Sequence, residues 1–232
     1  EYFRFLEKTQ WWARSELEAF QQEKLQMLIK HAYENTTYYH RIFKSLGLKP
    51  GDIKCIDALQ KLPILTKEHI RNRLEDLTTK NHTTEELMPS ATGGSTGEPM
   101  RFFIDKEWST CNMAAAYREW SWSGYNLGDK MAYLWGAPQD LSNQAKLKGK
   151  IYYLIQRTIW FDAFNMTEKT LDEYVRILRK FKPKVINAYA SAIYLMARYM
   201  EKRGIDDIRP KAILTTADML FGYRREVIER VF

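Results

Sequence analysis

Apolar residues recur at helical spacing through the first part of the chain. Residues 1–46 carry them three and four positions apart, which predicts helical structure that ends in a second, short helix. Two Gly and one Pro within 47–51 predict the turn that stops it. Thr66 is placed to cap a further helix, whereas the polar residues 78–90 predict a loop. We therefore expect residues 1–90 to form a helical N-terminal segment.

Beyond residue 90, short apolar runs alternate with helical stripes. A strand signal at 100–104 precedes a long helix that Asp105 can cap and that runs through Trp122. Further strands are predicted at 130–136, 157–164, 185–188 and 211–216. Amphipathic stripes predict helices before and after the last two of these strands. This alternation predicts an α/β fold of βαβ units with a largely parallel sheet in residues 91–232.

Composition narrows the class of protein. The 232 residues are 45% hydrophobic and 14% aromatic, which supplies a substantial core and excludes a disordered chain. No apolar run approaches the length of a membrane span. Two Cys and four His show no metal-ligand spacing, so we expect no protein-built metal site, no disulfide framework and a reducing, cytoplasmic location.

The net charge of +7 comes mostly from residues 91–232, which hold 22 basic and 16 acidic residues. Part of the excess forms a basic cluster of Arg176, Arg179, Lys180, Lys182 and Lys184. Such a cluster is compatible with nucleic-acid binding or with a solvated helix face and the loop after it. Since the cluster lacks the repeated aromatic–basic interleaving of single-strand-binding proteins, the second interpretation is favoured and no nucleic-acid partner is expected.

The two ends of the sequence indicate a fragment. The chain does not begin with Met, and residues 222–232 predict a helix that no Gly, Asn or Pro stops. A parallel sheet cut after its strand at 211–216 would have an open edge, so we expect this fragment to self-associate.

One segment carries a specific chemical signal. Residues 92–97 hold three glycines and three hydroxyl residues: Thr92, Gly93, Gly94, Ser95, Thr96 and Gly97. Glycines let backbone N–H groups converge on a phosphate, and hydroxyls add further donors. The segment is not a Walker A loop, because Glu98 stands where that motif has Lys. Taken alone, it is equally compatible with a phosphate-binding loop and with a flexible linker.

The order of motifs around this loop resembles the adenylate-forming enzymes of the phenylacetate–CoA ligase type, and among them the CapK-type capsular polysaccharide biosynthesis proteins. A Leu-Pro-x-x-Thr-Lys segment at 62–67 precedes the loop, as in that family. The loop positions that match the family are Thr92, Gly94, Ser95, Thr96, Gly97 and Pro99. Lys182, Pro183 and Tyr189 resemble a later segment, with Ala188 in place of its usual Gly.

The resemblance implies a fold, a reaction and further site residues. The fold would be part of the N-terminal domain of an acyl-CoA synthetase-like protein. ATP and a carboxylate would form an acyl-adenylate, and a thiol such as CoA would then take the acyl group, with Mg²⁺ on the phosphates. Residues 92–97 would hold the phosphates. Thr216, Ala217 and Asp218 match a segment near the adenine, with Asp218 in place of the family's Glu.

Two aromatic residues that follow predicted strands could line the acyl pocket. Ligands bind at the carboxyl ends of strands in α/β sheets, where Trp135 and Tyr189 are predicted to lie. For Trp135 core packing is the favoured interpretation, whereas for Tyr189 pocket and core are equally compatible. The family's later motifs, including its catalytic Lys, would lie beyond residue 232. We therefore expect a ligase parent in capsule or exopolysaccharide synthesis and an inactive fragment, with a non-catalytic scaffold of the same fold as the alternative.

Overall fold

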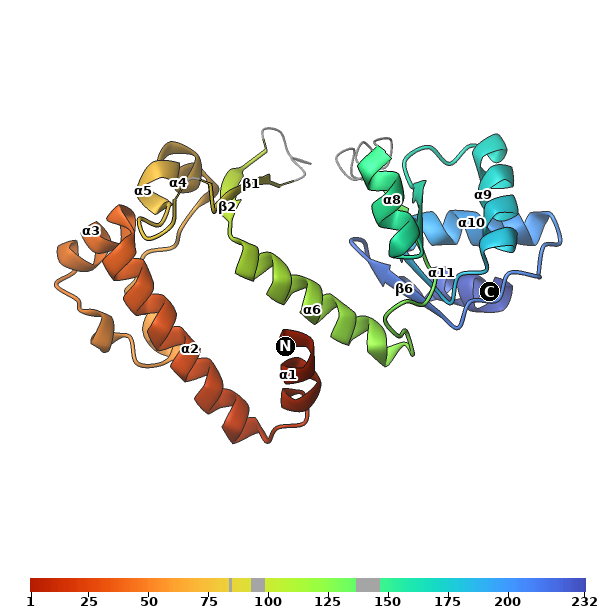
Figure 1. Ribbon diagram of the computed structural model, residues 1–232. Coiled ribbons are helices and arrows are strands. Elements are labelled where there is room, and N and C mark those ends of the chain that lie inside the picture. Colours follow the sequence, from red (N-terminus) through yellow and green to blue (C-terminus); the bar gives the residue numbers. More distant parts are fainter. Residues whose placement is uncertain (84, 93–98, 137–146) are drawn as a thin grey trace. The chain divides into compact units, whose positions relative to one another are not determined.

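The computed structural model describes residues 1–83, 85–92, 99–136 and 147–232. They form two compact units, Glu1–Ala116 and Tyr117–Phe232, which divide within one long helix (Figure 1). The division between residues 1–90 and 91–232 that composition suggested remains a prediction about domains. Each unit is described by itself.

The first unit is helical apart from one small sheet. Its elements are α1 (Tyr2–Thr9), α2 (Arg14–Asn35), α3 (Thr37–Ser45), the 3₁₀ turns η1 (Pro50–Asp52) and η2 (Ile56–Lys61), α4 (Lys67–Asn72), α5 (Leu74–Leu77), β1 (Met88–Ala91), β2 (Arg101–Ile104) and the start of α6 (Lys106–Trp122). Ile29, Phe43 and Ile53 form its buried core. The helical content expected for 1–46 is thus confirmed.

Local signals account for where these helices begin and end. Gly47 adopts a φ of +65°, and the N–H of Leu48 bonds to the carbonyl of Phe43, which closes the end of α3. The hydroxyl of Thr66 accepts the N–H of His69 at 3.2 Å and caps α4. Asp105 caps α6 through the N–H of Trp108 at 2.6 Å. All three signals were readable in the sequence.

The prediction of a loop at 78–90 was wrong for its last residues, 88–90. Residues 88–91 form β1, which pairs antiparallel with β2 in the register Met88 with Ile104. Pro89 has no N–H to donate and is tolerated because β1 has a single partner in this two-stranded sheet. Polar composition and a proline concealed the strand.

The second unit contains a four-stranded, wholly parallel sheet. Its strands are β3 (Met131–Trp135), β4 (Thr158–Asp162), β5 (Val185–Tyr189) and β6 (Ala212–Thr216), in the spatial order β4-β3-β5-β6. Its helices are the end of α6, α8 (Leu147–Ile155), α9 (Glu168–Phe181), α10 (Ala190–Lys202) and α11 (Gly222–Val231) (Figure 1). The expected α/β class with a parallel sheet is confirmed.

Alternate strand residues face two different cores. Ala132, Leu134, Ile186 and Ala188 are fully buried in the core that contains α9, α10 and α11. The opposite face carries a second cluster rich in aromatic side chains, which includes Met131, Tyr125, Tyr133, Val185 and the α6 residues Tyr117 and Trp120. Burial on both faces explains why these strands are continuous apolar runs.

Helix α8 was not predicted. Ile151, Leu154 and Ile155 have helical spacing, which is the signal that could have located it, yet all three are more than half exposed. Tyr153 approaches Trp160 of β4 at 5.6 Å between ring centroids. A helix that buries so little of its apolar surface leaves a weak sequence pattern.

Candidate functional site

The parallel sheet brings several predicted site residues to one edge. Trp135 is in register with Asp162, and Tyr189 is in register with Thr216, so these residues end four neighbouring strands. We call the carboxyl ends of β3 to β6, with the residues that follow them, the carboxyl edge. Ligands of α/β sheets bind outside this edge.

Three aromatic rings gather at the carboxyl edge. Trp135 and Tyr189 lie 4.8 Å apart between ring centroids, and Phe164, which follows β4, lies 6.1 Å from Tyr189. Phe164 is 75% exposed, while Trp135 and Tyr189 are half-buried. Tyr189 and Trp135 each pack partly against one of the two cores, so these side chains are only partly covered at the edge.

Gly136 lets the ring of Phe164 pack directly against the backbone that follows β3. A Cβ at position 136 would lie 2.5 Å from ring carbons of Phe164, so the ring rests against bare backbone. Sequence reasoning did not select Phe164. The feature that could have identified it is its position at the end of the strand predicted at 157–164.

The segment expected near the adenine begins at Thr216, the last residue of β6. Ala217 has a φ of +70°, which is unusual for a residue other than Gly, and the N–H of Asp218 bonds to the carbonyl of Thr216 at 2.9 Å. One oxygen of Asp218, Oδ2, accepts the N–H of Ser191 at 2.9 Å and Nη1 of Arg224 at 2.8 Å. A hydrogen bond with the Tyr223 hydroxyl, together with Asp218, raises the pKa of Arg224 and keeps it charged.

The glycine-rich segment belongs to the first unit. Thr92 joins its two ends, because its N–H bonds to the carbonyl of Met100 and its hydroxyl accepts the N–H of Met100, both at 3.0 Å. The other selected positions of this loop lie outside the described residues: Gly93, Gly94, Ser95, Thr96 and Gly97. Their assignment to phosphate therefore stays a prediction.

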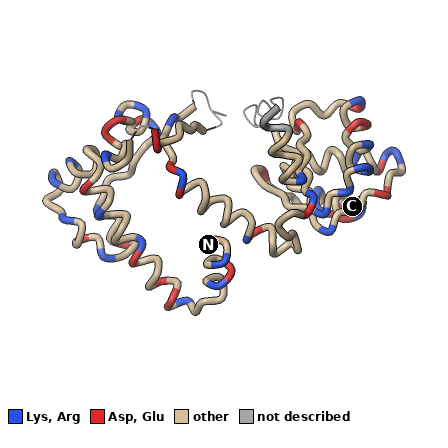
Figure 2. The backbone as a smooth tube through the Cα atoms, in the orientation of Figure 1, with Lys and Arg blue, Asp and Glu red and all other residues tan. Residues whose placement is uncertain are grey.

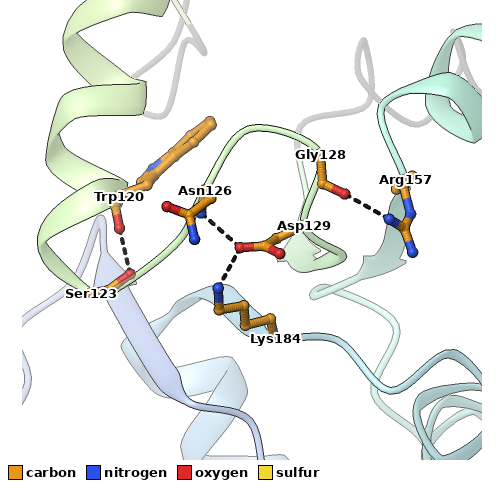
Figure 3. Close-up of polar contacts among 7 residues, drawn as sticks. All are labelled: Trp120, Ser123, Asn126, Gly128, Asp129, Arg157 and Lys184. Carbon is orange, nitrogen blue, oxygen red and sulfur yellow. Dashed lines mark hydrogen bonds and ion pairs between the residues drawn. The ribbon is translucent and has the colours of Figure 1, made fainter.

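The amino ends of the strands carry a different kind of network (Figure 3). Oδ2 of Asp129 accepts Nζ of Lys184 at 2.5 Å and the N–H of Asn126 at 2.7 Å, while Arg157 donates to the carbonyl of Gly128 at 3.0 Å. The bonds from Lys184 and Asn126 lower the pKa of Asp129. These groups satisfy one another and tie the start of β3 to the start of β5.

The basic cluster is partly neutralised. Lys184 pairs with Asp129, and Arg179 forms a two-point ion pair with Asp207 at 2.7 and 2.8 Å. Acidic and basic residues are interspersed along the described chain (Figure 2). These contacts support the solvated-surface interpretation of the cluster over a nucleic-acid site.

Two absences hold for the described part of the chain. No group of three or more His, Cys, Asp or Glu residues there could hold a metal ion. Within the same ranges, every helix is too short or too polar to cross a lipid bilayer.

Sequence comparison finds similarity to CapK and to phenylacetate-coenzyme A ligases. No protein-family model matches the chain. It is 25% identical to protein CapK of Staphylococcus aureus over 94% of its own length and 48% of that protein. It is 34% identical to phenylacetate-coenzyme A ligase of Escherichia coli strain K12 over 84 residues. The corresponding enzyme of Aromatoleum evansii is 25% identical over 84% of this chain and 43% of that enzyme.

Comparison with solved structures shows the fold. A crystal structure of 2-hydroxyisobutyryl-CoA ligase in complex with 2-HIB-AMP and CoA matches 94% of this chain and 47% of that one, with a TM-score of 0.70 and 17% sequence identity. CapK and the Aromatoleum evansii enzyme match most of this chain. The chain in turn spans about half the length of each of these two relatives. It is related to CapK and the phenylacetate–coenzyme A ligases, and it has the fold of part of an adenylate-forming CoA ligase.

Proposed function

We propose that this chain is the N-terminal part of an AMP-forming carboxylate ligase. The whole protein would convert ATP and a carboxylate to an acyl-adenylate and pass the acyl group to a thiol such as CoA. The observation that carries the proposal is similarity to phenylacetate-coenzyme A ligases over more than four fifths of the chain. We also propose a role in capsule or exopolysaccharide synthesis, for which the resemblance to CapK is the ground, and a cytoplasmic location for the whole protein.

The carboxyl edge is suited to a nucleotide base and an apolar acyl group. The left-handed Ala217 turns the backbone at the end of β6, and we assign the exposed side of this turn to a planar base. Trp135, Tyr189 and Phe164 offer ring surface that an apolar carboxylate tail can cover. We assign Thr216, Ala217 and Asp218 to the base and these three rings to the acyl group.

Phosphate binding is assigned to the loop at 92–97. The chemistry of its residues fits an anion, since backbone N–H groups and three hydroxyls supply donors. Mg²⁺ would neutralise phosphate charge when bound. We expect phosphate oxygens to supply part of its ligands.

Amide NMR with nucleotide tests the assignment. ATP or pyrophosphate with Mg²⁺ should shift the amide resonances of Gly93, Gly94 and Gly97 more than those of Gly47 and Gly204, which lie in helix-ending turns. AMP alone should shift the amides of 216–218. Millimolar ligand that leaves all of these resonances fixed in a folded chain would refute the proposal.

A matched pair of double variants separates the loop from general surface effects. Ser95→Ala with Thr96→Ala removes two loop hydroxyls and should weaken pyrophosphate binding at least tenfold. Ser109→Ala with Thr110→Ala removes an exposed Ser-Thr pair from α6 and should leave binding unchanged. Equal affinity of the two double variants would indicate that the loop is a linker.

A further inference from the structure

The turn between β6 and α11 adopts a backbone conformation that its sequence disfavours. Ala217 has a φ of +70°, where a side chain is strained and Gly is the usual residue. Within the turn, the N–H of Asp218 bonds to Thr216 and the N–H of Phe221 bonds to Met219. Both bonds span only two residues, so contacts from other parts of the unit must help to hold this shape.

The Asp218 carboxylate supplies one such contact. Its Oδ2 accepts the N–H of Ser191 in the first turn of α10. The residue before that helix, Tyr189, provides no side-chain cap. Asp218 therefore caps α10 from 27 residues away, where a negative charge also interacts favourably with the helix dipole.

Arg224 fixes the carboxylate from its other side. Its Nη1 lies 2.8 Å from the same Oδ2 and 3.5 Å from the carbonyl of Met219. The guanidinium lies 5.3 Å from the ring centroid of Phe221, 5.8 Å from that of Tyr223 and 5.9 Å from that of Tyr194. The side chain is 20% exposed, and its Nε donates to the Tyr223 hydroxyl at 3.1 Å.

This environment suits an arginine specifically. A planar guanidinium stacks against aromatic rings while its N–H groups bond within their own plane, which the compact ammonium of Lys does not do. Both protein bonds to Asp218 use Oδ2, so neither occupies Oδ1.

We propose that Arg224 is a positioning residue for nucleotide binding. It acts through Asp218, which it holds against the start of α10, and so presents the peptide groups of 216–218 at the carboxyl edge. This inference rests on the proposed function, because it assigns the ligand at that edge as the base of an adenine nucleotide.

A thermodynamic cycle on this chain tests the role. AMP is the probe, with affinity measured from the amide resonances of 216–218. Arg224→Gln should raise the Kd for AMP about tenfold. The matched control is Arg225→Gln, since Arg225 is two-thirds exposed and pairs with Glu229 on the surface of α11; its Kd should stay within twofold of wild type.

Two further variants distinguish positioning from general stability. Asp218→Asn should weaken AMP binding, and adding Arg224→Gln should then weaken it no further, because Arg224 acts through Asp218. Arg224→Lys keeps a cation opposite the carboxylate, so it should bind AMP more tightly than Arg224→Gln and more weakly than wild type. It serves as the test variant if Arg224→Gln does not fold. The amide resonance of Ser191 should move in Arg224→Gln and not in Arg225→Gln.

The outcomes separate this inference from the proposed function. A wild-type chain that binds AMP while Arg224→Gln binds it equally well overturns the role of Arg224 alone. Additive losses in the double variant also overturn it. A folded wild-type chain that binds no AMP at millimolar concentration overturns both the proposed function at this edge and the role of Arg224.

Discussion

The Asp129–Lys184 pair at the amino ends of β3 and β5 gives a quantitative prediction about stability. Asp129→Asn keeps the shape of the side chain and can still accept the N–H of Asn126, but it removes the charge that faces Lys184 (Figure 3). A hydrogen bond between charged groups contributes about 1.5–3 kcal/mol when it is sheltered. The two side chains are 28% and 30% exposed, so solvent screening reduces this contribution.

We therefore expect Asp129→Asn to lower the free energy of unfolding by about 1 kcal/mol, which lowers Tm by about 2–4 °C in a chain of this size. The effect should depend on pH. The pKa of Asp129 is lowered in the folded state, so its stabilisation is complete above the ordinary aspartate value of about 3.9 and is lost as pH falls through the lower, folded value. The difference between variant and wild type should thus shrink in acid.

Urea denaturation at pH 7 and at pH 3 measures this difference. Unfolding is monitored by circular dichroism and by the amide resonances of β3 and β5. Glu229→Gln is the matched control, because it removes an acidic partner from an exposed i,i+4 pair on α11. That pair should contribute about 0.3–0.5 kcal/mol. If Asp129→Asn costs no more than Glu229→Gln, or if its cost grows in acid, the account of this pair is wrong.

Three other predictions follow from the fold and the proposed function. Gly124→Ala should cost about 1–2 kcal/mol in urea denaturation, because its φ is +82°, whereas the flexible end of Lys211 that a Cβ would meet can move aside. Gly51→Ala, with open space around it, should be neutral, and equal costs would contradict this. The chain alone should not catalyse carboxylate-dependent ATP–pyrophosphate exchange, and robust exchange by the purified chain would contradict the expected incompleteness of its site. Among the described strands β6 pairs only with β5, so we expect self-association by light scattering; a monomer at high concentration would argue against this open edge.

The sequence by itself determined the elements whose signals are local. Short apolar runs located the four parallel strands, period-3.6 patterns located α9, α10 and α11, and Gly47, Thr66 and Asp105 marked helix ends. These signals were sufficient because each depends on residues only a few positions apart. The order of motifs also indicated the relatives that the comparisons later identified.

Only the tertiary structure decided which distant residues meet. Strand order and register placed Trp135 against Tyr189, 54 positions later, and brought Phe164 beside them. The bond from Ser191 to Asp218 and the aromatic surroundings of Arg224 likewise depend on β5 pairing with β6. No local pattern encodes such pairings, because they form when apolar faces are buried together and the register follows from the packing of the whole unit.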